Sequence, residues 1–214
     1  MNILLPIETI NRELDFKLVL GSLLSNGKHR IYIGQHDFLI KLLPKMYGGV
    51  YIGKNIFHKR SDLEDGKVYH LLKKHGFDII YLHEEGAVFT GTESDWKQVI
   101  SRQYSLDYFD ENDVVCVWGN FQRDFDQSRG SNAPIVTTGH PRFDLYKPKW
   151  QQIYKSTVNS IKQKYGDYIL VNGNYSGANH GLGVEYLFSD KGNYTIDDPE
   201  TRLKRISAYA PFPF

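Results

Sequence analysis

Residues 77–86 read FDIIYLHEEG, an apolar run that leads directly into a histidine, two carboxylates and a glycine. A short continuous apolar run is typical of a β-strand that is buried on both faces, as in a parallel sheet. Open α/β sheets place their ligand crevice at the carboxyl ends of the strands. We therefore expect a strand over residues 78–82, with His83, Glu84 and Glu85 as the first residues outside the sheet.

The same alternation of apolar runs and helical patterns extends over the first 140 residues. Helices whose length is about ten to fifteen residues separate the runs, which indicates a parallel sheet with helices on both faces. In residues 61–76, Ser61 and Glu64 form a predicted capping box and Gly76 closes the helix. The predicted fold class is α/β, a Rossmann-like doubly wound parallel sheet over residues 1–145. Its other predicted strands are NILLPI (2–7), HRIYIG (29–34), GGVYIGKN (48–55), NDVVCVWG (112–119) and APIVTTG (133–139).

The rest of the chain has a different pattern. A lysine-rich helix over residues 146–167 is predicted to act as a linker. The segment DYILVNGN (167–174) resembles the first strand of a second α/β unit, but the following sequence has one plausible helix and few apolar positions. We therefore expect residues 168–214 to be the start of an incomplete C-terminal domain.

Composition narrows the class of protein. Twenty-six Lys and Arg against 25 Asp and Glu leave a formal charge of +1, which argues against a nucleic-acid partner. One cysteine, Cys116, excludes an internal disulfide and fits a reducing cytoplasm. We find no signal-peptide pattern and no apolar stretch that could span a bilayer, so we expect a cytoplasmic protein; peripheral contact with a membrane surface is compatible with this.

His83, Glu84 and Glu85 are candidate catalytic residues, because carboxylates and histidine can accept a proton from a hydroxyl nucleophile. Strand alternation sends Glu84 to one face of the sheet and the other two residues to the opposite face. The alternative is that the two carboxylates cap the next helix and remain solvated.

Three further groups are candidate binding residues. Each group also has a structural interpretation: a surface ion pair for the first, a rigid corner for the second and a flexible loop for the third. No Gly-x-Gly-x-x-Gly fingerprint and no metal-ligand spacing is present, so we expect neither a dinucleotide cofactor nor a metal. The groups are Glu8, Arg12 and Glu13 after the first strand; His140, Arg142 and Asp144 after the sixth; and Asn174, Asn179 and His180 in the loop NYSGANHG.

Taken in order, the segments ETINREL, YLHEEG, GHPRFDL and YILVNGNYSGANHG resemble the N-terminal half of bacterial surface carbohydrate biosynthesis proteins. These are GT-B glycosyltransferase-like enzymes, near the capsule Kdo transferases and the CDP-glycerol glycerophosphotransferases. The resemblance covers about residues 1–185.

The resemblance implies two Rossmann-like domains across a cleft, one for the acceptor and one for the nucleotide. It implies a CMP-, CDP- or UDP-linked sugar donor and a glycan or lipid-linked acceptor in capsule or lipopolysaccharide biosynthesis, with peripheral contact with the inner membrane or a homodimer compatible with this role. The downstream RPHP segment of the family is absent. We therefore expect a fragment, or a cleft completed by a second polypeptide, with little transferase activity in this chain alone. The alternative is a noncatalytic glycan-binding or scaffold module.

Overall fold

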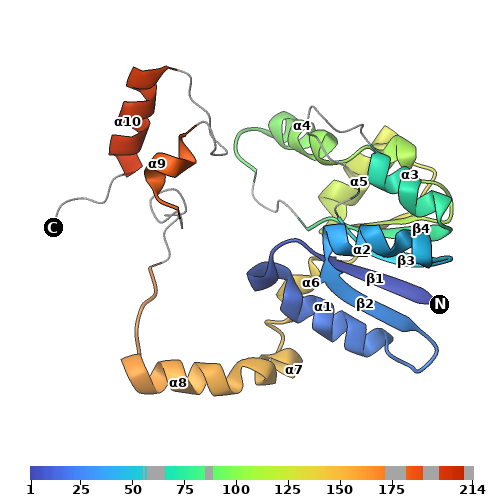
Figure 1. Cartoon of the computed structure of the whole chain (residues 1–214), viewed down its shortest axis with the longest axis horizontal. Helices are drawn as coiled ribbons and strands as arrows, with labels where there is room; N and C mark the ends of the chain where they lie inside the picture. Colours follow the sequence, from blue (N-terminus) through green and yellow to red (C-terminus); the bar gives the residue numbers. More distant parts are fainter. Residues whose placement is uncertain (55, 57–65, 85–88, 172–181, 190–197, 210–214) are drawn as a thin grey trace. The chain divides into compact units, whose positions relative to one another are not determined.

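The computed structural model describes residues 1–54, 56, 66–84, 89–171, 182–189 and 198–209 of the 214-residue chain (Figure 1). The chain divides into two compact units, Met1–Ser156 and Thr157–Phe214. The first unit includes the segment after residue 145, because Leu145, Trp150 and Tyr154 pack against the sheet.

The first unit is built on one six-stranded sheet in which all neighbouring strands are parallel. The predicted α/β class and doubly wound parallel sheet are confirmed, and all six predicted strands form. In their order across the sheet, the strands are β2 (Arg30–Gln35), β1 (Asn2–Ile7), β3 (Gly49–Gly53), β4 (Phe77–Leu82), β5 (Val114–Val117) and β6 (Ile135–Thr137).

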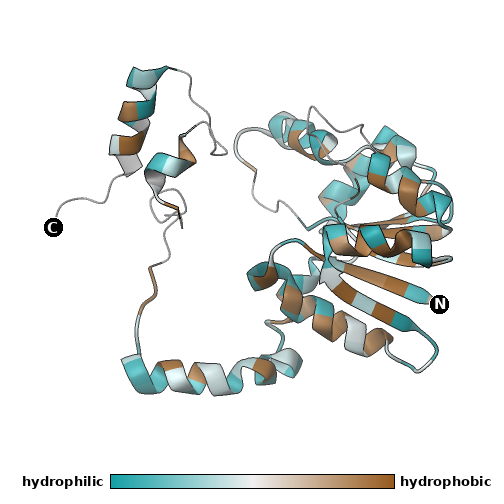
Figure 2. Cartoon of the chain, viewed as in Figure 1, coloured by the Kyte–Doolittle hydropathy of each residue, from teal (hydrophilic) through white to brown (hydrophobic). Residues whose placement is uncertain are grey.

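One face of the sheet carries the larger part of the core. Leu4, Tyr51 and Ile79 project from the strands into this layer and are fully buried. The apolar strands stand out from the mixed helices in Figure 2. The elements that cover this face are α2 (His36–Leu42), η1 (Leu43–Lys45), α3 (Lys67–Lys74), α4 (Glu93–Gln103), η2 (Leu106–Tyr108) and α5 (Asn120–Arg129).

The opposite face is covered mainly by α1 (Ile10–Leu24), whose Phe16 packs on Ile3, Leu5 and neighbouring strand residues. The two layers follow from the twofold period of a strand, since alternate side chains point to opposite faces. Shorter elements complete this layer: α6 (Pro141–Asp144), α7 (Pro148–Gln151) and η3 (Gln152–Tyr154).

The predicted capping box does not start α3. The helix begins at Lys67 after Gly66, which has a φ of 75°, while Ser61 and Glu64 lie outside the described residues. A capping interaction forms instead at α4, where the Asp95 carboxylate accepts a hydrogen bond of 2.7 Å from the backbone N–H of Thr92. At the other end of α3, Gly76 follows the helix with a φ of 75°, as its position after the last helical turn predicts.

The predicted strand at residues 167–174 is wrong over its described part. Tyr168–Val171 has no regular secondary structure, and Ile169 is 93% exposed. A strand requires a hydrogen-bonded neighbour, and the described residues of the second unit provide none. These residues contain most of α8 (Lys155–Tyr165), which begins at the end of the first unit, together with α9 (Val184–Leu187) and α10 (Pro199–Tyr209).

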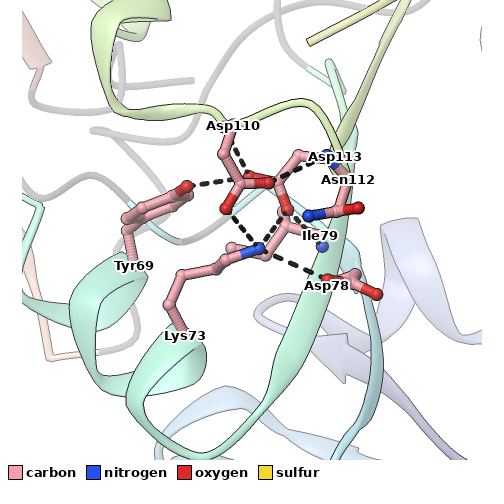
Figure 3. A network of polar contacts seen from close by, with 7 residues as sticks. All are labelled: Tyr69, Lys73, Asp78, Ile79, Asp110, Asn112 and Asp113. Carbon is pink, nitrogen blue, oxygen red and sulfur yellow. Dashed lines mark hydrogen bonds and ion pairs between the residues drawn. The ribbon is translucent and has the colours of Figure 1, made fainter. Parts of the chain in front are cut away.

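A polar network joins the amino ends of β4 and β5 to α3 (Figure 3). The Asp113 carboxylate is fully buried and accepts hydrogen bonds from Tyr69 Oη (2.8 Å), Lys73 Nζ (3.0 Å) and the backbone N–H of Ile79 (2.8 Å) and Asp110 (3.1 Å). We call this group the amino-edge network. Lys73 also reaches Asp110 at 2.9 Å. Tyr69 and Lys73 belong to α3, Ile79 belongs to β4, and Asp113 directly precedes β5. The hydrogen bonds to Asp113 therefore hold this helix against the two strands.

Burial opposes the charged form of Lys73, but the hydrogen bonds that Lys73 donates to Asp110 and Asp113, together with the charges of these carboxylates, prevail and raise the pKa of Lys73. For Asp110, burial raises the pKa of the carboxyl group, but the hydrogen bonds that it accepts from Lys73 and from the backbone N–H of Asn112, together with the charge of Lys73, outweigh burial and lower that pKa. Both shifts keep the groups charged at neutral pH, so the network acts as a fixed electrostatic clamp.

We predict that Asp113→Ala destabilises the first unit by about 3 kcal/mol, because it removes the buried carboxylate that accepts from Tyr69, Lys73 and two backbone N–H groups, although Lys73 keeps Asp110. Asp78→Ala is the matched control. Its carboxylate is 54% exposed and 3.4 Å from the same lysine, so it should cost less than about 1 kcal/mol. Urea unfolding measures both; equal losses for the two variants would contradict the clamp.

Candidate functional site

The strand order places a topological switch point between β1 and β3. The chain adds β2 on one side of β1 and then crosses to add β3 on the other side. In open α/β sheets such a point leaves a crevice outside the carboxyl ends of the two strands. Here β1 ends at Ile7 and β3 at Gly53, so Glu8 and Lys54 are the first residues beyond the two strand ends.

The close approach of β1 and β3 at this edge depends on a glycine. A Cβ atom on Gly53 would lie 2.6 Å from Cγ of Pro6 in β1. Any other residue would have to push the strands apart. Gly53 therefore allows Lys54 to reach across to the loop after β1.

Five charged side chains gather at the switch point, and we call them the edge cluster: Glu8, Glu13, Lys17, Lys54 and Glu84. Lys54 Nζ lies 3.1 Å from Glu8 Oε2 and 3.4 Å from Glu13 Oε1. Glu13 Oε2 accepts a 2.7 Å hydrogen bond from the backbone N–H of Glu8. The first turn of α1 is thereby tied to the ends of β1 and β3.

The deepest part of the edge cluster is the ion pair between Lys17 and Glu84. Lys17 Nζ lies 3.1 Å from Glu84 Oε1, and it donates a hydrogen bond of 3.1 Å to the carbonyl of Ile52. The exposed fraction of the side chain is 0% for Lys17 and 2% for Glu84. A pair so far from water is costly to assemble and sensitive to the loss of either partner.

Burial sets the direction of both pKa shifts. It lowers the pKa of Lys17, although Glu84 opposes the shift. It raises the pKa of Glu84; Lys17 opposes this rise and the negative charge of Glu13 adds to it. Both groups are thus moved toward neutrality, as desolvation requires, and Glu84 becomes a more basic carboxylate than a solvated glutamate.

Two carboxylate oxygens in the edge cluster lack a hydrogen-bond donor within the described chain. They are Oε2 of Glu84 and Oε1 of Glu13, and both atoms are buried. Lys54 lies near the second oxygen, but without hydrogen-bond geometry. Since buried polar atoms are nearly always paired, each such oxygen calls for an explanation.

His83 lies at the same edge of the sheet but on the opposite face from Glu84, as strand alternation predicts. Its Nδ1 accepts a 3.0 Å hydrogen bond from Gln122 Nε2, and its Nε2 lies 2.5 Å from Gln103 Oε1. The amide of Gln122 is oriented because its Oε1 accepts from the backbone N–H of Trp118. These contacts assign the neutral tautomer with the proton on Nε2.

The network around His83 continues into the interior. Gln122 also donates to Tyr104 Oη at 2.9 Å, and Tyr104 donates to the buried Asp126, which Arg129 holds at 2.9 Å. Burial raises the pKa of Asp126, with Tyr104 and Arg129 opposing. His83 is therefore an interior connector between β4, α4 and α5, and its ring nitrogens are both engaged.

His140 supports the main chain of Glu84. Its Nε2 donates to the Glu84 carbonyl at 3.2 Å, and its Nδ1 accepts from the backbone N–H of Arg142 at 3.0 Å, which caps α6. The ring of Trp118 packs edge-on against the His140 ring, with 4.5 Å between the ring centroids. The GHPRFD and HEEG segments thus meet at one residue, Glu84.

The remaining candidate residues are not among the five side chains of the edge cluster, and four of them lie outside the described residues. Arg12 is exposed, and its Nη2 donates to Thr9 Oγ1 at 3.1 Å. Asp144 forms an ion pair with Lys147. Arg142 is partly buried, and its Nε has no hydrogen-bond partner within the described chain. Glu85, Asn174, Asn179 and His180 lie outside the described residues.

Sequence reasoning missed both lysines of the edge cluster. A signal for Lys17 was present: the buried stripe of α1 consists of Glu13, Phe16, Lys17 and Gly21, so two charges occupy positions where a core-facing helix has apolar residues. Lys54 follows its strand as Glu8 follows β1. Across the described ranges, no group of three or more His, Cys, Asp or Glu side chains is placed to hold a metal ion.

We predict that Lys17→Met destabilises the first unit by about 3–5 kcal/mol near pH 8, because it leaves a buried carboxylate without a counter-charge. Without Lys17, the folded-state pKa of Glu84 rises further above its unfolded value. Stability of the variant then falls as pH rises between these two values, so the loss should be smaller near pH 5.

Lys28→Met is the control for this prediction, since Lys28 is exposed; it should change stability by less than about 0.5 kcal/mol. Chemical denaturation at both pH values measures the two variants. A loss for Lys17→Met that is the same at both values would contradict the coupling to Glu84.

The comparisons with known proteins give no relative for this chain. No protein-family model, no curated protein and no solved structure matches it.

Proposed function

We propose that the first unit is the acceptor-side domain of a GT-B-like glycosyltransferase of bacterial surface polysaccharide biosynthesis, and that the edge cluster receives the acceptor hydroxyl. The donor would be a CMP-, CDP- or UDP-linked sugar and the acceptor a glycan or a lipid-linked glycan. The convergence of three segments supports this proposal. ETINREL provides Glu8 and Glu13, HEEG provides Glu84, and GHPRFD provides the histidine that holds the Glu84 carbonyl.

The observation that carries the proposal is the Oε2 atom of Glu84. It is a buried acceptor with no hydrogen-bond donor in the described chain, at the switch point of the sheet. A sugar hydroxyl is a donor of the kind that such an oxygen lacks. Lys17 holds the other oxygen, Oε1, and so fixes the direction in which Oε2 points.

In the proposed reaction, the acceptor O–H donates to Glu84 Oε2. The hydroxyl oxygen forms a bond to the anomeric carbon of the donor as the bond from that carbon to the nucleotide phosphate breaks. The proton passes to Glu84 and the nucleotide leaves with the bonding electrons. A carboxylate whose pKa is raised by burial is a stronger base for this step than a solvated one.

A second candidate is a noncatalytic glycan-binding or scaffold module. The observation that favours it is the second unit, whose described residues form helices and no strand, whereas a nucleotide-binding GT-B domain is built on a sheet. Such a module would use the same edge cluster for sugar hydroxyls without transfer.

Isothermal titration of the whole chain with oligosaccharides and with CMP, CDP and UDP sugars tests these alternatives. We expect oligosaccharide binding that Glu84→Gln weakens by about 10- to 100-fold, the loss expected for one hydrogen bond to a charged group. Glu111→Gln is the matched control, because Glu111 is exposed on the loop before β5. Glycan binding without nucleotide binding, even with a complementing chain, favours the module. Binding that is equal in both variants contradicts a role for Glu84.

The same titration should depend on pH. Oligosaccharide affinity is expected to fall as pH drops through the pKa of Glu84, because protonation removes the acceptor. Since that pKa is raised, the loss should begin at a higher pH than for a solvated glutamate. The charged groups that face Glu84 are Lys17 and Lys54, which favour its ionised form, and Glu13, which opposes it. An affinity in Glu84→Gln that keeps the wild-type pH profile would assign the dependence to another group.

A further inference from the structure

The segment that leads into and forms α8 carries a concentrated positive charge. From Leu145 to Gly166 the chain has five lysines, at positions 147, 149, 155, 162 and 164, and no acidic residue. The whole chain has a formal charge of only +1. The positive charge is therefore a local property of this segment, and it is independent of the edge cluster.

The same helix carries an apolar stripe. Val158, Ile161 and Tyr165 follow the i, i+3, i+7 spacing that places side chains on one face of a helix. They are 44%, 37% and 60% exposed. Figure 2 shows apolar and polar residues mixed along α8. Trp150 and Tyr154, which precede α8, pack instead against the core of the first unit.

The lysines lie beside the stripe and not opposite to it. At about 100° per residue, Lys155 and Lys162 lie on one flank of the stripe and Lys164 on the other. The opposite face carries uncharged polar residues, Asn159, Ser160 and Gln163. Lysines on the flanks of an apolar face can extend their ammonium groups past it, toward the same plane.

We propose that α8 is a docking surface for an anionic lipid bilayer. Val158, Ile161 and Tyr165 enter the boundary between headgroups and acyl chains, and Lys155, Lys162 and Lys164 contact the lipid phosphates. Basic residues that flank an apolar stripe are typical of helices that lie in the membrane interface. Within the described ranges no helix is long and apolar enough to cross a membrane, so the contact is peripheral.

Charge complementarity favours an anionic bilayer over two other partners, a second copy of the chain and a nucleic acid. A second copy of α8 would bring lysine flanks against lysine flanks, which repel each other. A nucleic acid would satisfy the lysines but would leave the apolar stripe without an apolar partner. Only an anionic bilayer surface offers negative headgroups beside hydrocarbon.

The anchoring of the preceding turns fits this role. Tyr154 Oη donates to Asp15 Oδ2 of α1 at 2.7 Å, and Trp150 packs on the core layer below α1. These contacts attach the start of the helical segment to the first unit. A helix attached at one end can hold an enzyme or binding module at a surface.

Co-sedimentation of the whole chain with vesicles tests the proposal. We expect binding to vesicles of phosphatidylglycerol mixed with phosphatidylcholine, and little binding to phosphatidylcholine alone. The triple variant Lys155→Gln, Lys162→Gln, Lys164→Gln should lose about fivefold in partitioning per lysine, on the order of 100-fold in total. A control triple variant removes the same charge elsewhere, at the exposed Lys28, Lys41 and Lys45, and should lose much less.

The apolar stripe has its own test. Val158→Ser with Ile161→Ser should also weaken binding to the mixed vesicles, and circular dichroism checks that the chain stays folded. In a separate variant, Tyr165→Trp, the tryptophan emission should shift to shorter wavelength when mixed vesicles are added, because the indole enters an apolar region. This reporter does not depend on a loss of binding.

Four outcomes would overturn the proposal. They are absence of binding to the mixed vesicles, equal binding to phosphatidylcholine alone, equal losses in the two lysine triple variants, and an unchanged emission of Tyr165→Trp. A concentration-dependent dimer that Val158→Ser with Ile161→Ser dissolves, without vesicle binding, would assign the stripe to a second copy of the chain instead.

Discussion

The buried ion pair between Lys17 and Glu84 is the constraint on which the carboxyl edge of this sheet depends. It joins α1 to the residue that follows β4, and through the carbonyl of Ile52 it also joins both to β3. Two charges have been removed from water to form it, and such a pair contributes little net stability compared with apolar packing. Its position at the topological switch point, beside Glu8, Glu13 and Lys54, is where open α/β sheets bind ligands.

The buried carboxylates at the two edges of the sheet differ in how many hydrogen-bond donors they have. At the amino edge, Asp113 accepts four hydrogen bonds and Lys73 bridges several carboxylates, so the network is saturated. At the carboxyl edge, Glu84 Oε2 and Glu13 Oε1 have no donor within the described chain. A saturated network stabilises the fold, whereas open acceptors leave a role for a ligand. The amino edge thus stabilises the fold, and the carboxyl edge is where we propose that a ligand binds.

The HEEG segment illustrates how one strand serves both purposes. Successive side chains of β4 alternate between the two core layers, and the alternation continues past Leu82. His83 enters the larger layer and connects Gln103 with Gln122. Glu84 enters the layer of α1 and meets Lys17. His83 and Glu84 are adjacent, and in the sequence both are candidate proton acceptors. In the structure, however, His83 connects elements of the interior, whereas Glu84 is part of the candidate site.

The amino-acid sequence by itself determined the α/β class, the six strands and the residues that leave them at the carboxyl ends. Its signals are local, since apolar runs such as NILLPI and FDIIYL identify buried strands without knowledge of their neighbours. It also determined that His83 and Glu84 point to opposite faces, because strand alternation is a local property.

Only the tertiary structure decided which of these residues meet. The strand order puts β1 beside β3, and this brings Lys54 to Glu8 and Glu13 across 40 or more residues of chain. The partner of Glu84 is Lys17 on α1, and the histidine that holds its carbonyl comes from the segment after β6. The segment at Tyr168–Val171 shows the same principle in reverse. Its apolar run predicts a strand, yet no strand forms there, because pairing depends on a neighbouring strand that a local pattern cannot specify.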